Sequence, residues 1–210
     1  MKLLILTQKV DKNDEVLGFF HRWLEEFSKR CEKVTVIALE KGEFSLPENV
    51  EVLSLGKERG VGKIGRVLTF FTLILREISS YDKVLVHMNP EYVVLGGWLW
   101  WLLGKRIGLW YVHRSVDAKL KIAHLFADEI FTAAPESFRL PSHKVHVLGH
   151  GIDVERFICL PARWGVPLRI SSVGRVTKIK NNDVLIKAAE LLKQRGLSLR
   201  VSFVGGVATR

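Results

Sequence analysis

Residues 83–112 read KVLVHMNPEYVVLGGWLWWLLGKRIGLWYV, and this stretch decides the fold class. Short apolar runs at 83–88 and 107–112 flank the longer segment 91–104. Asn89–Pro90 suits the passage from the end of a strand into a helix. Short apolar runs that alternate with helical segments are typical of βαβ units and of a parallel sheet. The stretch therefore predicts a strand, a helix and a second strand in that order.

The same alternation continues along the chain on both sides of this unit. The segment Val61–Ser79 is predicted to be a helix because apolar residues recur on one face at Ile64, Val67, Leu68, Phe71, Leu75 and Ile78. The other expected strands of this part are Leu3–Thr7, Lys33–Leu39, Val50–Leu55, Glu129–Thr132 and Lys144–Leu148. The other expected helices are Val16–Arg30 and 115–126. About seven strands with helices between most of them predict an α/β fold with a Rossmann-like, doubly wound parallel sheet.

The periodic pattern is interrupted between Asp153 and Pro167, where two prolines and little periodicity indicate a linker. It resumes with an expected strand at 168–173, a helix at 183–195 and a strand at 199–204. The inward residues of that helix are expected to be Leu185, Ala188, Ala189 and Leu192. We therefore expect a first domain over 1–160 and the first βαβ unit of a second Rossmann-like domain over 161–210. This second domain is expected to be incomplete, because one βαβ unit cannot cover both faces of its sheet.

The composition favours anionic partners and an intracellular location. The formal net charge is +10 and the isoelectric point is near 9.8, which suits phosphate ligands, acidic membranes or nucleic acid. Cys31 and Cys159 lie far apart and in no ligand spacing, which indicates a reducing compartment or no structural disulfide. The apolar run Leu3–Leu6 is too short for a signal peptide, and nothing reaches the roughly 20 apolar residues that span a bilayer. The expected location is cytoplasmic.

Several polar residues follow the ends of the expected strands, and Gly18 lies in the loop after the first strand. Ligands of open parallel sheets bind beyond the carboxyl ends of the strands, so these residues are candidates for a site. His87, Glu136 and Ser137 are candidates for the wall of a ligand-binding cleft. A histidine at a strand end can instead cap the next helix, which is the alternative for His87. His113 is a candidate for contact with substrate, and its alternative is a structural hydrogen bond.

The loop Gly174–Asn181 (GRVTKIKN) carries the sharpest signal in the second domain. Gly174 lets the backbone turn closely after the strand. Arg175, Lys178 and Lys180 then place three cations just before a helix, whose N-terminal amide groups also favour an anion. This chemistry suits a diphosphate. The alternative is a solvated basic loop.

Three segments resemble motifs of one enzyme family. GRVTKIKNNDVLIKAAELL at 174–192 is similar to the donor-site segment of GT-B glycosyltransferases of family 4, in which Arg175 and Lys180 match the pair that binds the nucleotide diphosphate. GHGIDVERF at 149–157 resembles the segment that closes the first domain of that family. FTAAPESF at 131–138 resembles its Thr-x-Ser-Glu segment. The resemblance covers essentially the whole chain.

The resemblance implies two Rossmann-like domains that face each other across a cleft, the first for the acceptor and the second for the sugar nucleotide. It implies retaining transfer of a sugar from a UDP- or GDP-sugar to a glycan, lipid or small hydroxyl acceptor, with no required metal or other cofactor. His113 matches the first-domain histidine near the transferred sugar and is the implied catalytic residue. Gly18 would admit the diphosphate, and Gly174, Arg175 and Lys180 would bind it.

Three features depart from the family pattern. Only Gly18 stands in the loop after the first strand, where the family often has paired glycines, and Asn181 stands where a glycine usually follows the lysine. The family's acidic motif with two glutamates would lie beyond Arg210. We therefore expect the chain to be part of an enzyme. The alternative is a non-catalytic acceptor-binding or membrane-docking module that needs a separate donor-domain chain.

The remaining basic and histidine-containing segments leave further alternatives. His143 and His146 would face opposite sides of a strand, so a shared metal ion is not expected. The basic segment Lys57–Arg76, with the tryptophan-rich segment Trp98–Trp101, fits either peripheral docking at the inner face of an anionic membrane or a core-facing helix with a solvated basic edge. Nucleic acid is not expected as a partner, because the aromatic residues lie within apolar runs and no such motif is present.

Overall fold

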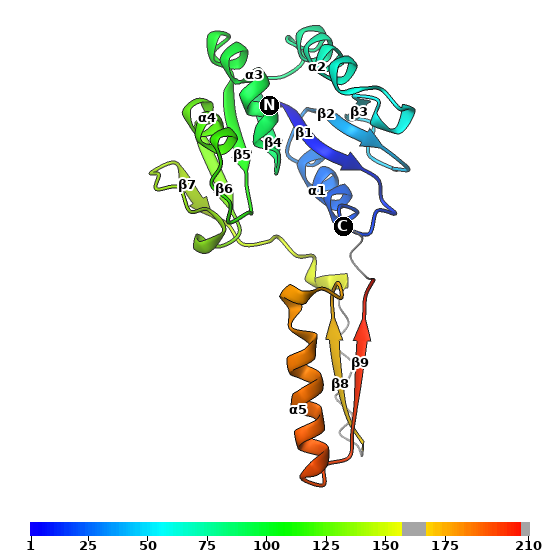
Figure 1. Cartoon of the computed structure of the whole chain (residues 1–210). Helices are drawn as coiled ribbons and strands as arrows, with labels where there is room; N and C mark the ends of the chain where they lie inside the picture. The colour runs from blue at the N-terminus through cyan, green and yellow to red at the C-terminus, as the bar shows by residue number, and fades with distance from the viewer. Residues whose placement is uncertain (157–166, 207–210) are drawn as a thin grey trace. The chain divides into compact units, whose positions relative to one another are not determined.

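The computed structural model describes residues 1–156 and 167–206, which form two compact units. Unit 1 comprises Met1–Ile152 and unit 2 comprises Asp153–Arg210 (Figure 1). The predicted domain boundary after residue 160 lies outside the described residues, as does the middle of the predicted linker. The two units divide after Ile152.

The seven strands of unit 1 form one parallel sheet (Figure 1). In register, Leu4 lies opposite Thr35 on one side and Val84 on the other. From edge to edge the strands are β3 (Val50–Ser54), β2 (Lys33–Lys41), β1 (Lys2–Val10), β4 (Lys83–His87), β5 (Arg106–Trp110), β6 (Glu129–Thr132) and β7 (Val145–Val147). The chain runs outward from β1 to β3, crosses to β4 and continues to β7. This is the predicted doubly wound arrangement, and the fold class is confirmed.

The helices of unit 1 divide between the two faces of the sheet. Helix α1 (Phe19–Ser28) covers one face through Phe20 and Leu24, which pack with Leu3 and Ile5 of β1. The opposite face is covered by α2 (Lys63–Arg76), α3 (Pro90–Leu102) and α4 (Ala118–Phe126). The helices lie on different faces because the chain first adds strands toward β3 and later adds strands toward β7. Right-handed crossovers in these two opposite directions place their helices on opposite faces of the sheet.

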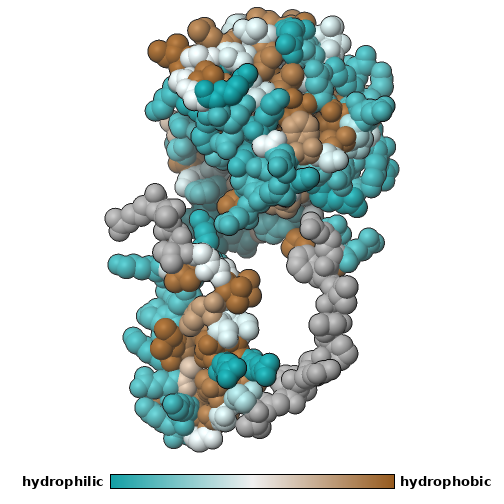
Figure 2. Space-filling view, turned by 90° about the vertical axis from the view of Figure 1, so that its right-hand side faces the viewer, coloured by the Kyte–Doolittle hydropathy of each residue, from teal (hydrophilic) through white to brown (hydrophobic). Residues whose placement is uncertain are grey.

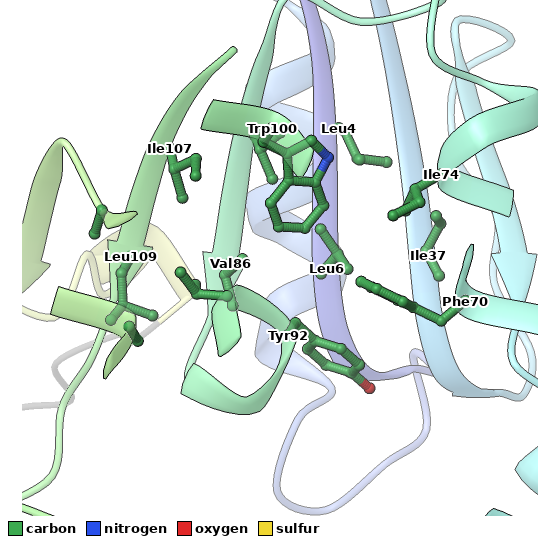
Figure 3. Close-up of a cluster of buried hydrophobic side chains, with 14 of the residues drawn as sticks. Leu4, Leu6, Ile37, Phe70, Ile74, Val86, Tyr92, Trp100, Ile107 and Leu109 are labelled. Carbon is green, nitrogen blue, oxygen red and sulfur yellow. The ribbon is translucent and has the colours of Figure 1, made fainter. Parts of the chain in front are cut away.

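The core on the α2–α4 face is built around a buried tryptophan (Figure 3). Trp100 is fully enclosed between α3 and the sheet, and its indole Nε1 donates a hydrogen bond of 3.0 Å to the Tyr81 hydroxyl. Tyr81 donates in turn to the Ile74 carbonyl oxygen at 3.2 Å, and burial raises the pKa of this phenol to about 12. Both polar atoms of this aromatic pair are therefore satisfied inside the core.

Helix α2 has apolar side chains on two sides. Its buried residues are Phe70, Leu73 and Ile74, which meet the sheet. The residues whose spacing predicted the helix lie mostly on the other side, where Ile64 and Leu68 are exposed. Periodicity therefore located the helix correctly, but it did not identify the side that faces the core.

The α1 face of the sheet contains an apolar groove beside the C-terminal end of α1. Its volume is about 370 Å³, and it reaches across the amino-terminal ends of β1, β4, β5 and β6. Phe27 and Cys31 form one wall, while Leu85, Gly108 and Phe131 line it from the strands. Among the described helices of unit 1, α1 alone packs on this face.

Unit 2 consists, in its described part, of two short 3₁₀ turns, two parallel strands and one longer helix (Figure 1). The strands are β8 (Leu168–Val173) and β9 (Leu199–Val204), joined through α5 (Asn182–Gln194). Leu185, Ala189 and Leu192 of α5 are half-buried. Ala188, which was predicted to face inward, is exposed, because a sheet of two strands is too narrow to cover that side of the helix.

No helix in the described ranges 1–156 and 167–206 combines the length and the apolar character needed to cross a bilayer. The most apolar helix, α3, has 13 residues, and a membrane-spanning helix needs about 20.

Candidate functional site

The strand ends of unit 2 meet through two glycines. Gly174 follows β8 with φ of 143°, and Gly205 follows β9 with φ of 146°. The Gly174 amide donates to the Val204 carbonyl oxygen at 2.9 Å. A Cβ atom on Gly205 would overlap the carbonyl group of Gly174. Only glycine allows both the backbone angle and the close approach, so this pair fixes the loop that follows β8.

The cations of that loop stand beside this glycine pair. A 3₁₀ turn at Lys178–Lys180 leads directly into α5. The Lys180 side chain folds back so that its Cε lies 3.7 Å from the place where a Gly174 Cβ would be. Arg175 and Lys180 are both exposed, and within the described residues neither takes part in a salt bridge. Arg175, Lys178 and Lys180 thus lie just before a helix N-terminus, and this chemistry suits a diphosphate. Binding of a diphosphate at this loop stays a prediction.

Asn181 has a conformation that explains its place in the loop. It adopts φ of 50° and ψ of 41°, the left-handed region that glycine favours and that asparagine tolerates best among other residues. Asparagine can therefore stand at this position, where the sequence resemblance implies a glycine, without severe backbone strain.

Gly18 lies at a tight turn just before α1. Its backbone is right-handed helical, so the glycine is not required by a positive φ. A Cβ atom would instead lie 2.5 Å from the Asp14 carbonyl oxygen and 3.1 Å from that of Lys12. The space that glycine leaves is therefore occupied by its own loop. Admission of a diphosphate by Gly18 stays a prediction.

A cluster of ion pairs holds that loop, and it was not predicted from the sequence. The Lys9 ammonium lies 2.9 Å from Asp14, 3.4 Å from Asp11 and 3.3 Å from Glu40. Backbone donation from Leu17 and contact with Lys9 lower the pKa of Asp14 to about 2. Bonding to Asp14 raises the pKa of Lys9. Lys9, Asp11 and Asp14 are close in sequence, but Glu40 comes from β2, and no spacing rule links it to them.

His113 and Ser137 are brought together beyond β5 and β6. The His113 amide donates to the Ser137 carbonyl oxygen at 3.1 Å, and its Nδ1 accepts from the Ser115 amide at 3.2 Å. The His113 side chain is exposed, as is that of Glu136 in the adjoining 3₁₀ turn (Pro135–Ser137). Three of the predicted site residues thus lie at one place on the rim, with the Nε2 of His113 directed to no described partner.

His87 has a different environment although it ends the neighbouring strand. It is only 1% exposed, stacks on Phe20 with ring centroids 4.0 Å apart, and shares a hydrogen bond of 3.1 Å with the Thr7 hydroxyl. Burial lowers the pKa of His87 to about 4, so the imidazole is neutral near pH 7. It does not cap α3, whose N-cap Asn89 lacks a side-chain capping bond. A role for His87 in the cleft stays a prediction.

The turn after β7 reaches back to α1. Gly149 and Gly151 have φ of 79° and 62°, respectively. A Cβ on Gly151 would lie 3.4 Å from the Trp23 ring, so the glycine allows the chain to pass close to α1. Trp23 also meets Trp110 edge-on at the end of β5. The predicted first-domain closing segment therefore begins within unit 1, while Phe157 at its end lies outside the described residues.

The described residues contain no group of three or more His, Cys, Asp or Glu side chains that could hold a metal ion. His146 lies on β7 at 3.8 Å from Glu129, and both side chains are exposed.

The geometry is that of an open α/β fold, and comparison with solved structures identifies it as the GT-B type. Anabaena HepE, crystallised with UDP, superposes with a TM-score of 0.62 at 12% identity, over 98% of this chain and 70% of HepE. UDP-GlcNAc 2-epimerase from Methanocaldococcus jannaschii gives 0.52 at 12% identity, over 96% of this chain and 65% of that enzyme. At these identities the likeness concerns the fold, which transferases and epimerases share.

Sequence comparison is more specific. This chain is 31% identical over 155 residues to an Escherichia coli protein, WcaL, whose name proposes a glycosyltransferase of colanic acid biosynthesis. The Salmonella typhimurium protein of the same name is 31% identical over 150 residues. These alignments cover 73% and 71% of this chain, which spans about a third of the length of these relatives. No family model matches the chain.

Proposed function

We propose that this chain belongs to a glycosyltransferase that takes a sugar from a nucleoside-diphosphate sugar. The observation that carries the proposal is the loop Gly174–Asn181, in which Arg175 and Lys180, which form no salt bridge with any described residue, follow Gly174 just before α5. Relatives named as glycosyltransferases and GT-B neighbours crystallised with UDP or UDP-glucose support it. The finer assignment is a retaining enzyme of the family-4 type, with a UDP- or GDP-sugar as donor.

In this proposal unit 2 acts on the donor through electrostatics. Arg175 and Lys180 hold the diphosphate, while Gly174 and the first amides of α5 allow its oxygens to approach the backbone. Negative charge grows on the diphosphate as the bond to the sugar breaks. Fixed cations at that position stabilise the transition state more than the ground state, which is how such a site accelerates the reaction.

Unit 1 then serves the acceptor, which we take to be a glycan, a lipid-linked glycan or a small hydroxyl compound. His113 is the residue proposed to contact the transferred sugar, because its Nε2 is exposed at the rim beside Ser137 and Glu136. Gly18 and His87 lie at the adjoining strand ends. No step is assigned to a metal, and the proposed location is cytoplasmic, at the inner face of the membrane.

A second candidate is a non-catalytic module that binds an acceptor or docks on a membrane and works with a separate donor-domain chain. It is favoured by the contrast between the wide, well-buried sheet of unit 1 and the two strands of unit 2. The two candidates differ in whether this chain binds a nucleoside diphosphate.

The test is calorimetric titration of the 210-residue chain with UDP and with GDP. We expect micromolar binding of one of them, which the double variant Arg175→Ala/Lys180→Ala weakens by roughly 100-fold, because two charge-assisted contacts are lost. The matched control is Lys193→Ala/Arg200→Ala, which removes two exposed cations elsewhere in unit 2 and should leave the affinity unchanged.

Equal losses in the two double variants would mean that general charge, not this loop, attracts the nucleotide. No binding to the folded wild-type chain would favour the non-catalytic module. Circular dichroism of each variant supplies the check on folding.

A further inference from the structure

The outward side of α2 is an apolar stripe that nothing in unit 1 covers. Ile64 is 80% exposed, Leu68 63% and Leu75 52%, at the spacing of one helix side. Val67 and Phe71 lie along the same stripe. Figure 2 shows hydrophobic residues at the surface of unit 1 among hydrophilic ones. Contiguous apolar surface of this kind on an otherwise well-buried domain marks a contact with a partner or a membrane.

A groove lies at the N-terminal end of the same helix. Its volume is about 470 Å³, and it is enclosed by α2, the start of α3 and the start of α4. Its lining is largely apolar and comprises Leu39, Leu55, Val67, Phe70, Tyr92 and Leu95. Val67 belongs to both the groove and the stripe, so the apolar surface continues from one into the other.

The rim of the groove is cationic. Lys63, Arg66 and Lys119 lie on it, with Glu91 as the single acid. Lys119 is neutralised by Glu91, whose carboxylate oxygen lies 2.7 Å from its ammonium. Lys63 and Arg66 form no salt bridge with any described residue. Two unneutralised cations thus stand above an apolar pocket, an arrangement that complements a ligand with an anionic head and an apolar tail.

Helix α3 also exposes indole rings. It packs beside α2, since Phe70 stacks on Tyr92 with centroids 5.8 Å apart. On its outer side Trp98 is 47% exposed and Trp101 is 68% exposed, whereas Trp100 is buried. Tryptophan is enriched where a protein meets the interface of a bilayer, because the ring is apolar and its N–H prefers a polar environment.

We propose that the stripe of α2 and the groove at its N-terminal end bind an anionic lipid at the surface of a bilayer. The lipid head would pair with Lys63 and Arg66, the groove would take the apolar part next to the head, and the stripe would lie flat in the interface. Helix α2 has 14 residues and is about 21 Å long, which suits an interfacial helix and not a spanning one. The proposal does not depend on the glycosyltransferase assignment.

The charge of the rim selects a lipid surface over an apolar protein partner. A partner protein that covered this stripe would also bury Lys63 and Arg66. Removing these two charges from water would cost free energy of binding. At an anionic bilayer each cation near the surface contributes about 1 kcal/mol to binding and stays hydrated.

The experiment is vesicle flotation of the full chain at low salt. One vesicle is phosphatidylcholine alone, and the other contains phosphatidylcholine and phosphatidylglycerol. We expect binding to the second and at least roughly ten-fold weaker binding to the first. Ile64→Asp/Leu68→Asp should lower partition into the anionic vesicles by roughly ten-fold or more, and Lys63→Gln/Arg66→Gln by roughly ten-fold.

The matched control is Val147→Asp/Leu148→Asp, which changes two exposed apolar residues at the edge strand β7 and should bind as wild type does. Soluble glycerol phosphate, which offers the head without the tail, should not displace the chain at millimolar concentration.

Equal binding to both vesicles, or wild-type binding by the Lys63/Arg66 variant, would overturn the proposal. Displacement by glycerol phosphate would overturn it too, since the site would then recognise a free phosphate. Titration of the same variants with UDP in the absence of vesicles separates this site from the donor loop, because both α2 variants should titrate as the wild-type chain does.

Discussion

The two units reach their structures by different means. Unit 1 encloses its sheet, and side chains such as Trp100 and Phe20 are almost entirely removed from water. In unit 2 no described side chain is fully enclosed, and Val173 at the end of β8 is 78% exposed. Its loop is instead fixed by backbone constraints at Gly174, Asn181 and Gly205. Burial therefore supplies the scaffold in unit 1, and backbone geometry positions the charged loop in unit 2.

The largest expected effect tests this contrast through side-chain truncation. Trp100→Ala should lower the free energy of unfolding of unit 1 by about 4 kcal/mol, because it leaves a large cavity and removes the hydrogen-bond donor to the buried Tyr81 hydroxyl. Leu185→Ala in half-buried α5 should cost about 1 kcal/mol. Hydrogen exchange of peptides from α3 and α5, followed by mass spectrometry, measures each unit separately.

The exposed neighbour Trp101 supplies the control, since Trp101→Ala should change the stability by less than about 0.5 kcal/mol. Similar losses for Trp100→Ala and Leu185→Ala would break the contrast between the two units.

The next effect is a pH dependence confined to unit 1. The ordinary histidine pKa is about 6.5, and burial lowers that of His87 to about 4. Between these values the unfolded chain binds a proton that the folded chain does not. The free energy of unfolding should therefore fall by about 3 kcal/mol as pH drops from about 6.5 to about 4.

Urea unfolding of the wild-type chain and of His87→Gln across this range measures the contribution, which the variant should lack. His113→Gln should keep it, because His113 is exposed. A slope that persists unchanged in His87→Gln would assign the pH dependence to another group.

The smallest effects concern the backbone constraints of unit 2. Gly205→Ala should cost about 2 kcal/mol and raise hydrogen exchange at the start of α5, because the methyl group would overlap Gly174 and φ of 146° excludes other residues. Asn181→Gly should change the stability by less than about 0.5 kcal/mol, because the asparagine already adopts the glycine conformation. A harmless Gly205→Ala would show that the glycine pair does not fix the loop.

Much of the fold could be predicted from the sequence because it depends on local patterns. The bounds of β6, β8 and β9 agree with their predicted ranges, since each is a short apolar run between polar segments. The side of α2 that faces the core could not be predicted, because apolar residues occupy both sides of the helix. Only the packing of the helix against β2 and the core cluster decides in favour of Phe70 and Ile74.

The site was predictable where its chemistry lies in one segment. Arg175, Lys180 and Gly174 are close in sequence, and the structure places them together. The environments of His87 and Lys9 depend on residues from other elements, such as Phe20 and Glu40, so sequence alone could not foresee a buried imidazole or an ion-pair cluster. The roles of all these residues in catalysis or binding stay predictions that the proposed titrations test.

The contact between Gly174 and Gly205 also has a consequence for how this protein can diverge over evolutionary time. A change at Gly205 that adds even one carbon is opposed by a backbone atom, which cannot rotate away as a side chain does. Val173 and Val204, the adjacent residues, point into solvent and can vary widely at little cost. Descendants of this chain that retain the loop should therefore keep both glycines while their neighbours drift. Loss of either glycine in a descendant would be an early sign that the loop has been released from selection.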